Sequence, residues 1–502
     1  MKNSDWFRIK HYPHIGYPLT SKDKKKMCSY VKNKNKISTH SFLPFIHKVI
    51  KKRRFRKSYD EVGNLLNDGK RVVLKPKERD IFYASHLDSC VFSYYGYLLG
   101  KKYEKSLEKK DLVEIVTAYR RVPIFENGKL VRNKCNIDFA NDIFNFIRQN
   151  QDKELITLTF DIKNFFDSLD HEILKKAWCN VLNQSKLDDD HYNVYRNITK
   201  FSFVEEKDLF NLFKDKIIVK TKTGSIRKKK VSKLKYMYSQ NAIAFCERKD
   251  IHIIRKKSLI RNNKYFESKL RNFGICQGSS ISPILANIYM LEFDEFLNSE
   301  LKKMAGLYRR YSDDMVIVCA KENKTNIISL VKDNLRDLAK LEIQDQKTQA
   351  FHFYKENDRL VCLQEFNEII NSNSKKRNFE YLGFSFDGEK AWLKTSTLAK
   401  FYRKMKLNVR RGKYYSKVIN NDTRGQIFKR RIYKKFSYVG ARRYFKYERV
   451  KGTTDQWRKS SYKYNWGNFI TYAKLAINTL KNNGIRSQIK RHWKILNDQI
   501  KR

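Results

Sequence analysis

Several aspartates of this 502-residue chain stand where strand-like runs end, and the first of them is Asp161. Residues 155–160, Leu-Ile-Thr-Leu-Thr-Phe, predict a buried strand, and Asp170 is suited to cap the helix that follows. A carboxylate at the end of a buried strand is costly unless it is paired or binds a cation. Taken alone, such an aspartate is more often a helix cap or a salt-bridge partner than a ligand.

Two adjacent carboxylates, Asp313 and Asp314, lie in a tight turn between two strand-like stretches of residues 306–320. Adjacent carboxylates repel each other unless a divalent cation neutralises them, although Asp-Asp is also common in ordinary turns. Two strand-end carboxylate sites from distant parts of the sequence are what a two-metal phosphoryl-transfer site needs. Their oxygen ligands suit Mg²⁺.

Between these two sites lies a loop rich in glycine and serine, residues 273–290. It leads into a predicted helix that begins at Pro283, with Ser282 as its N-cap. Such a loop lets the backbone approach a base pair or a sugar closely. By itself it is an ordinary helix start.

The elements that must position these residues divide the chain into three parts. Residues 1–70 form an N-terminal extension, and residues 71–394 alternate strand-like and helical patterns, which indicates an α+β or α/β class. A basic insertion lies at about 205–260 and contains a hairpin-like run around residues 216–230. Residues 395–502 hold 30 Lys and Arg but only 4 Asp and Glu, interleaved with aromatics. We interpret them as a separate, basic, helical C-terminal domain.

The charge balance of the whole chain indicates a polyanionic partner. Lys and Arg number 107 against 53 Asp and Glu, a net charge of +54, and hydrophobic residues make up 41%. Such an excess of one sign destabilises a compact protein unless nucleic acid neutralises it. An anionic membrane is the competing partner, but the chain contains no apolar run of about 20 residues.

The eight cysteines are widely separated and include no Cys-x-x-Cys pair, so neither a zinc knuckle nor a redox motif is indicated. The first residues, Met-Lys-Asn-Ser-Asp, lack a hydrophobic signal region. Free thiols without a signal favour a reducing cytosol, and we therefore expect a cytoplasmic protein with no membrane partner.

The three segments, in this order, resemble the motifs of the reverse transcriptases. The first matches Phe-Asp-Ile-Lys-x-Phe-Phe-Asp-x-Leu-x-His, the second Gln-Gly-x-x-x-Ser-Pro-x-Leu-x-Asn and the third Tyr-x-Asp-Asp. Residues 341–348 and 379–388 are similar to the later motif that carries a lysine and to the primer-grip hairpin. Residues 75–81 are similar to the fingers segment that holds the triphosphate. The resemblance covers about residues 70–410.

The resemblance implies an α+β, right-hand polymerase fold with fingers, a palm with an antiparallel sheet and a helical thumb. It also implies that Asp161 and Asp313 hold two Mg²⁺ ions, for which Mn²⁺ can substitute. Asp314 lies beside them, and the main-chain carbonyl of Ile162 is an extra ligand. Lys347 would be the general acid for the departing pyrophosphate.

The resemblance also assigns the residues that bind the nucleotide. Phe166 matches the aromatic residue that blocks a ribose 2′-OH, and Gln277 and Gly278 would line the nascent base pair. The basic residues of the fingers would neutralise the triphosphate; these are Arg79, Lys77 and Lys75. Each of these cations is otherwise a solvated surface charge.

The sequence departs from the family pattern where Cys276 replaces the usual proline before Gln277. No endonuclease signature follows the polymerase region, which disfavours a mobile-intron protein with its own nuclease. Residues 40–47 and 83–89 look most similar to the non-mobile bacterial reverse transcriptases of the phage-defence (DRT) and abortive-infection type.

We therefore expect an RNA-directed DNA polymerase that makes cDNA from dNTPs with a dedicated, structured noncoding RNA, in antiviral defence. A retron or group II intron-type reverse transcriptase or maturase is an alternative. An inactive RNA-binding protein is another, but the intact carboxylates at 161, 313 and 314 count against it. The sequence does not identify the template or the primer, and a homo-oligomer is compatible with it.

Overall fold

The computed structural model describes residues 6–57, 66, 68, 70–221, 223–263, 265–266, 269–365, 377–418, 424–439, 446–449, 456–461, 467–480 and 484–501. The chain forms two compact units, each made of several stretches of the sequence. The first unit comprises Met1–Arg120, Thr159–Ile317 and Glu322–Thr348, and the second comprises Arg121–Leu158, Val318–Lys321 and Gln349–Arg502. Among the described helices, none is both long and apolar enough to cross a membrane.

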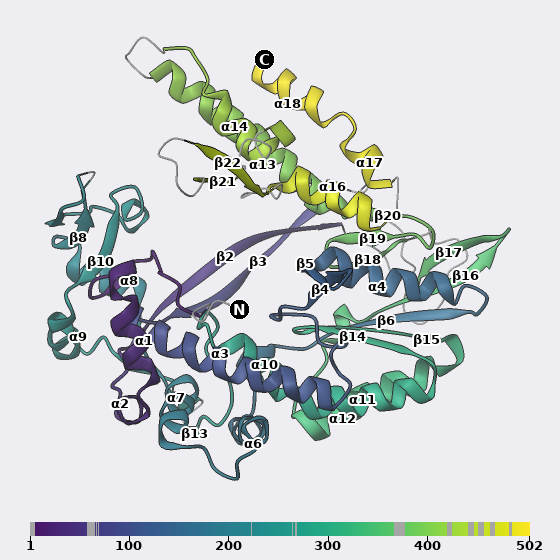
Figure 1. The fold of residues 1–502 in the computed structure, drawn as a ribbon, viewed down its shortest axis with the longest axis horizontal. Helices are drawn as coiled ribbons and strands as arrows, with labels where there is room; N and C mark the ends of the chain where they lie inside the picture. Colours follow the sequence, from purple (N-terminus) through teal and green to yellow (C-terminus); the bar gives the residue numbers. More distant parts are fainter. Residues whose placement is uncertain are drawn as a thin grey trace. The chain divides into compact units, whose positions relative to one another are not determined.

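A long antiparallel hairpin dominates one sheet of the first unit. Its strands β2 (Phe45–Lys57) and β3 (Arg71–Tyr83) are the two extended arrows in Figure 1, and β2 also pairs in parallel with β7 (Ser202–Glu205). The sheet order is β11-β7-β2-β3, where β11 is Arg261–Asn262. Because β2 pairs along its length with β3, the end of the predicted N-terminal extension and the start of the predicted catalytic region share one sheet.

The basic insertion folds onto a second sheet of the first unit. The hairpin predicted around residues 216–230 is present as β8 (Ile217–Lys220) and β9 (Ile226–Lys229), in the sheet order β1-β10-β8-β9. The other strands are β1 (His14–Ile15) and β10 (Ala242–Cys246). A buried cluster joins Phe210 and Phe245 of the insertion to Ile46 and Val204 outside it, so the insertion shares an apolar core with neighbouring strands.

Helices make up most of the remainder of the first unit. Residues 86–109 form one long helix, in which apolar positions such as Phe92 and Leu99 are buried. The helices of this unit are α1 (Lys24–Lys32), α2 (Lys34–Ser38), α3 (His86–Lys109), α5 (Phe165–Ser168), α6 (His171–Leu182), α7 (Asp189–Thr199), α8 (Glu206–Phe213), α9 (Ile251–Lys256), α10 (Ser282–Tyr289), α11 (Leu291–Lys303) and α12 (Lys324–Ala339).

A five-stranded sheet carries the strand ends singled out in the sequence. Its order is β14-β15-β6-β16-β17. The strands are β6 (Leu155–Asp161), β14 (Leu307–Tyr311), β15 (Asp314–Ala320), β16 (Gln349–Glu356) and β17 (Arg359–Gln364). Four successive residues of β6, from Leu155 to Leu158, are buried, which explains its continuous apolar run.

The second unit combines small sheets with a helical C-terminal part. The hairpin of β4 (Pro123–Glu126) and β5 (Lys129–Asn133) precedes α4 (Asn136–Gln149), and a three-stranded sheet contains β18 (Phe379–Tyr381), β19 (Phe384–Phe386) and β20 (Ala391–Leu393). The C-terminal elements are α13 (Thr395–Val418), α14 (Lys429–Phe436), β21 (Lys446–Arg449), β22 (Trp457–Ser461), α16 (Phe469–Thr479), α17 (Gly484–Ile489) and α18 (His492–Lys501). The helical character predicted after residue 394 is thus present in α13, α14 and α16–α18, together with a short hairpin.

Candidate active site

The backbone brings the end of β6 next to the turn between β14 and β15. The amide of Ile162 donates to the main-chain oxygen of Asp313 (3.2 Å), and the amide of Gln344 donates to that of Asp161 (2.8 Å). Asp161 and Asp313 are therefore neighbours, although 152 positions separate them in the sequence. The two aspartates that the sequence analysis paired as ligands lie together.

Lys347 completes this group from the segment after α12. Its Nζ donates to Oδ1 of Asp161 (2.6 Å), and the two side chains are 27% and 21% exposed. A substrate can reach the pair because both side chains are partly exposed. Their partial burial reduces the screening of each charge by water. Three of the four predicted catalytic residues, Asp161, Asp313 and Lys347, thus gather at one place.

The turn that carries Asp313 and Asp314 depends on an unusual backbone conformation. Ser312 has a φ of +65°, in the left-handed region, and its side chain is buried. Asp313 is half-buried, whereas Asp314 begins β15 and is exposed. A serine in this conformation persists only where its surroundings hold it in place.

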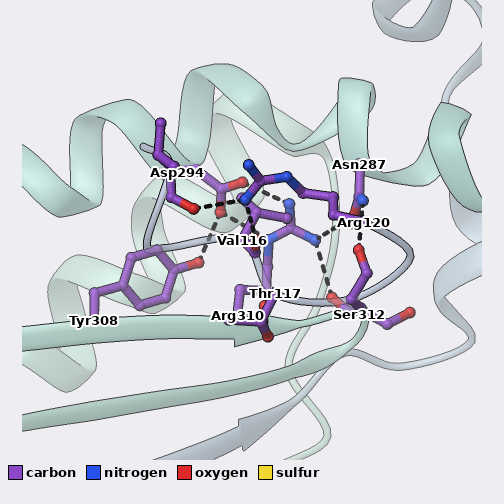
Figure 2. Close-up of polar contacts among 10 residues, drawn as sticks. Val116, Thr117, Arg120, Asn287, Asp294, Tyr308, Arg310 and Ser312 are labelled. Carbon is purple, nitrogen blue, oxygen red and sulfur yellow. Dashed lines mark hydrogen bonds and ion pairs between the residues drawn. The ribbon is translucent and has the colours of Figure 1, made fainter. Parts of the chain in front are cut away.

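A fully buried ion pair lies directly behind this turn, as Figure 2 shows. Arg310 donates to both carboxylate oxygens of Asp294, from Nε to Oδ1 at 2.8 Å and from Nη2 to Oδ2 at 2.5 Å, and both side chains are 0% exposed. Its Nη1 also donates to the main-chain oxygen of Ser312 (3.1 Å). The guanidinium thereby links helix α11 to the residue that precedes Asp313.

The same network extends to neighbouring elements. Burial and the charge of Asp294 hold the pKa of Tyr308 well above its usual value, so the phenol stays protonated and donates to Asp294 Oδ1 (2.8 Å). Arg310 Nη1 also reaches the side-chain oxygen of Asn287 on α10 (3.3 Å), and the main-chain oxygen of Arg310 accepts from the amide of Thr117 (2.9 Å). Several elements of the first unit thus fix the position of the turn.

The sequence analysis did not identify Arg310 or Asp294 as important. A signal was present, because Tyr308 and Arg310 alternate along β14 and therefore face the same side of the sheet, and Ser312 follows in the turn. All three are buried. The chain contains 107 Lys and Arg, however, so nothing in the sequence distinguishes Arg310 from the many cations that face solvent.

The glycine- and serine-rich loop contacts the end of strand β3. The amide of Phe82 donates to the main-chain oxygen of Gln277 (2.7 Å). Gly278 has a φ of +113°, and a Cβ there would lie 2.6 Å from the main-chain oxygen of Phe82. The loop can therefore approach the strand this closely only with glycine at position 278.

Two details of this loop differ from or refine the sequence prediction. Ser282 is not the N-cap of helix α10; the N-cap is Ile281, and the Ser282 hydroxyl instead donates to the main-chain oxygen of Cys276 (2.7 Å). The serine thus closes the loop on itself. Burial raises the pKa of the Cys276 thiol to about 12, so the residue that replaces proline is an inert apolar side chain.

The segment after β6 packs against the start of this loop. Asn164 adopts a left-handed φ of +47° and leads into α5, and the amide of Ile275 donates to the main-chain oxygen of Phe166 (2.8 Å). Phe166 is half-buried, whereas the adjacent Phe165 is 3% exposed and belongs to the core. Asp170 accepts from the first amides of α6, as its sequence position predicted.

The three basic residues of the fingers segment lie along β3, but they are not equivalent. Lys52 pairs with Lys77 and Arg54 with Leu74, so β3 carries an extra residue at Lys75 and Pro76. Such a bulge suits a proline, which has no amide hydrogen to donate. Lys77 and Arg79 lie two residues apart on one face, whereas the bulge interrupts this alternation before Lys75.

Replacing Gly278 with alanine should reduce polymerisation about tenfold or more, because the new methyl group forces the loop away from Phe82 and strains its backbone. Primer extension on an RNA template measures the effect. Gly224→Ala is the matched control, since Gly224 also has a positive φ (+94°) but meets no atom within 4 Å. Equal losses in the two variants would show that the close approach to Phe82 is unimportant.

The donors at this site fit a cation that the substrate helps to coordinate. Mg²⁺ in phosphoryl-transfer sites is commonly held by one or two carboxylates together with substrate phosphates. Within the described ranges, no group of three or more His, Cys, Asp or Glu side chains is placed to hold a metal ion by itself. The Lys347 ammonium group forms an ion pair with Asp161. Asp161 and Asp313 therefore suit an ion completed by substrate oxygens.

Comparison with known proteins finds one family that matches part of the chain. Residues 215–386 match the reverse transcriptase (RNA-dependent DNA polymerase) family, a range that includes Gln277, Asp313 and Lys347 but begins after Asp161. No curated protein matches the chain.

Two solved structures similar to this chain are telomerases. Telomerase from Candida albicans in complex with the TWJ fragment of telomeric RNA matches at 13% identity and a TM-score of 0.37, over 77% of this chain and 53% of that one. Apo telomerase from Candida tropicalis matches at 11% identity and a TM-score of 0.37, over 98% and 67%. This chain thus spans about half the length of the first.

The family match and the strand-end aspartates define the class of protein. The chain contains a reverse transcriptase domain, with an α+β, right-hand polymerase fold. A domain of this family is an RNA-directed DNA polymerase, and hence a nucleotidyltransferase.

Proposed function

We propose that this enzyme makes cDNA at the site formed by Asp161, Asp313 and Lys347, and that it works with a dedicated, structured noncoding RNA in bacterial defence against phage. The contact of the Asp161 backbone segment with Asp313, with Lys347 on the Asp161 carboxylate, carries the catalytic part of the proposal. The net charge of +54 supports the RNA partner. The similarity of residues 40–47 and 83–89 to non-mobile, defence-associated reverse transcriptases supports the biological role.

In the proposed reaction, the primer 3′-hydroxyl loses its proton to water and its oxygen bonds to the α-phosphorus of a dNTP. The bond from that phosphorus to the oxygen that bridges to the β-phosphorus breaks. Two Mg²⁺ ions, for which Mn²⁺ could substitute, would neutralise the phosphates and lower the pKa of the primer hydroxyl. Asp161 and Asp313 would hold them, with Asp314 and the Ile162 carbonyl beside them. Lys347 would give its proton to the departing pyrophosphate, which its place beside Asp161 allows.

The dNTP would lie between the end of β3 and the loop at 277–278. The hydrogen bond from Phe82 to Gln277 joins these two segments, which supports the proposal that Gln277 and Gly278 contact the nascent base pair. Lys77 and Arg79, on one face of β3, would bind the triphosphate. Lys75 lies at the bulge, farther along the same strand, and we propose that it too contacts the triphosphate.

Replacing Phe166 with alanine should increase the use of rNTPs relative to dNTPs, because the half-buried ring would otherwise occupy the space that a 2′-OH needs. The measurement is the ratio of kcat/KM for a dNTP and for the matching rNTP. Phe165→Ala is the control, since Phe165 is buried and its loss should lower stability rather than change sugar selectivity. An unaltered ratio in Phe166→Ala would exclude this residue as the gate.

We also propose that the helical C-terminal part serves as the thumb and grips nucleic acid. In α14, Ile432 and Phe436 belong to a buried cluster with Phe401, whereas the three cations that begin the helix are exposed. These cations are Lys429, Arg430 and Arg431. The apolar side of the helix thus has a structural role, and the cations are available to contact phosphates.

Reversing Lys429, Arg430 and Arg431 to glutamate should weaken RNA binding, and the defect should shrink as salt rises, because the wild type then loses the same counterion-release contribution. A binding titration at several salt concentrations measures it. Residues 24–26, three exposed lysines of α1, provide a control with the same change in charge. Equal binding by the α14 variant and the wild type at low salt would show that this surface does not contact RNA.

The proposed RNA partner is tested by sequencing the nucleic acid that copurifies with the protein. We expect one discrete structured RNA and DNA that is complementary to part of it. A heterogeneous mixture that reflects cellular RNA abundance would contradict a dedicated partner while leaving the polymerase activity intact.

A further inference from the structure

A cavity of about 660 Å³ lies in the C-terminal helical part of the second unit. Helices α16, α17 and α18 and the residues just after α14 surround it. Its lining includes Tyr438, Lys474, Arg486, Lys490 and Trp493. None of these residues belongs to the catalytic site, and the reverse transcriptase match ends at residue 386, before the cavity begins.

Local sequence features explain how the cavity forms. Ile470, Lys474 and Asn478 recur at intervals of four on α16, so one face of this helix lines the cavity. Asn468, the N-cap of α16, donates from its side-chain amide to the main-chain oxygen of Ser437 (2.7 Å). His492 Nε2 donates to that of Phe436 (2.5 Å). The segment that presents Tyr438 is therefore fixed both to α16 and to α18.

Aromatic side chains form one wall of the cavity. The ring of Trp493 lies 5.5 Å from that of Tyr438 and 5.4 Å from that of Tyr433, and Lys474 Nζ lies 4.7 Å from the centre of the Tyr438 ring. Trp493 is 37% exposed. A large indole that stays partly exposed at the edge of a cavity offers a surface on which a planar group can stack.

Cations supply the polar part of the lining. Lys474, Arg486 and Lys490 are all exposed, and the described lining residues include no carboxylate. A helical core needs aromatic residues, but it does not need three cations around one cavity that no described carboxylate lines. The lining therefore fits a ligand that has both a planar ring and a negative charge.

We propose that this cavity binds one unpaired nucleotide of a single-stranded nucleic acid, with its base against Trp493 and Tyr438 and its phosphates against Lys474, Arg486 and Lys490. A volume of 660 Å³ lies in the range of sites that enclose small ligands, so it has room for a nucleotide. The inference rests on the proposed function only in that the ligand is a nucleic acid. Its effect is to hold one unpaired nucleotide of the template, the partner RNA or the product.

The test measures binding of a fluorescent single-stranded oligouridine to the full-length protein, with no dNTPs present. Trp493→Ala should weaken binding about tenfold, which is the scale of one lost base–aromatic stack. An oligonucleotide of the same length without bases should bind the wild type and Trp493→Ala equally, because it has nothing to stack. A 5-bromouridine version should cross-link to Trp493 or Tyr438.

Arg486→Glu tests the phosphate contact, with Lys494→Glu as its matched control. Lys494 is exposed on α18, next to Trp493 in the sequence, but it does not line the cavity. Both variants change the net charge equally, so Arg486→Glu should weaken binding several-fold more than Lys494→Glu. Equal effects of the two, or unchanged oligouridine binding by Trp493→Ala, would overturn the proposal.

Two further comparisons test whether stacking and a polynucleotide ligand explain the result. Trp493→Phe, which keeps a stacking ring, should bind more tightly than Trp493→Ala, and circular dichroism shows whether each variant folds. A deoxyuridine oligonucleotide and uridine monophosphate are compared with the oligouridine. Tighter binding of the monophosphate than of either oligonucleotide would contradict a polynucleotide site. Primer extension by the same variants reports separately on the catalytic proposal.

Discussion

Replacing Asp294 with asparagine should lower the free energy of unfolding by about 3–5 kcal/mol, because it leaves the fully buried Arg310 guanidinium without a charge partner. Although burial alone lowers it, the charge and hydrogen bonds of Asp294 hold the pKa of Arg310 above its ordinary value, so the arginine cannot escape by losing its proton. Chemical denaturation followed by circular dichroism measures the change. Lys303→Met, which breaks the surface pair with Glu300, should cost less than about 1 kcal/mol.

A double variant separates stability from function at this ion pair. Asp294→Leu combined with Arg310→Met removes both charges, and such a replacement is often close to neutral for stability. Its primer-extension activity should nevertheless stay low, because the Ser312 carbonyl loses its donor and the turn that carries Asp313 is no longer held. Full activity in a stable double variant would show that Arg310 is not a positioning residue.

The parts of the site that could be predicted from sequence are those that local patterns determine. An apolar run that stops at Asp161 marks a strand end, and Asp170 caps the helix that follows, as predicted. Asp-Gly is a strong signal for a hairpin turn, and Asp387-Gly388 forms one between β19 and β20. A second turn, at Leu382 and Gly383, joins β18 to β19. Side-chain periodicity and turn chemistry act over a few residues, so a single sequence contains them.

The parts that could not be predicted depend on contacts between distant segments. Nothing local to Asp294 shows that it lies behind the turn at Ser312, or that Gly278 meets the backbone of Phe82. The position of Ser282 before Pro283 favours the role of N-cap. In the structure, its hydroxyl instead donates to the main-chain oxygen of Cys276. Tertiary packing decides among the partners that local chemistry allows.

Asp161→Asn and Asp313→Asn should each reduce dNTP incorporation by about 1000-fold or more, while RNA binding stays within about twofold of wild type. An amide keeps the shape of the carboxylate but removes the charge that a cation needs. Asp161→Asn also removes the partner of Lys347, whereas Asp313→Asn leaves that pair in place. The two variants therefore separate loss of the carboxylate pair from loss of the lysine contact.

Asp333→Asn serves as the control, because Asp333 is an exposed carboxylate of α12 that pairs only at the surface, with Arg336. It should polymerise at the wild-type rate. A Lys347→Met variant should show a slower chemical step with intact RNA binding, since it keeps both aspartates but lacks a proton donor for pyrophosphate.

The most direct test of the account is primer extension on an RNA template with Mg²⁺ and dNTPs, run side by side for the wild type, Asp161→Asn and Asp313→Asn, with RNA binding measured on the same preparations. The account predicts extension by the wild type, none by either variant, and equal RNA binding by all three. Extension by either variant at the wild-type rate would contradict the assignment of Asp161 and Asp313 as the catalytic carboxylates.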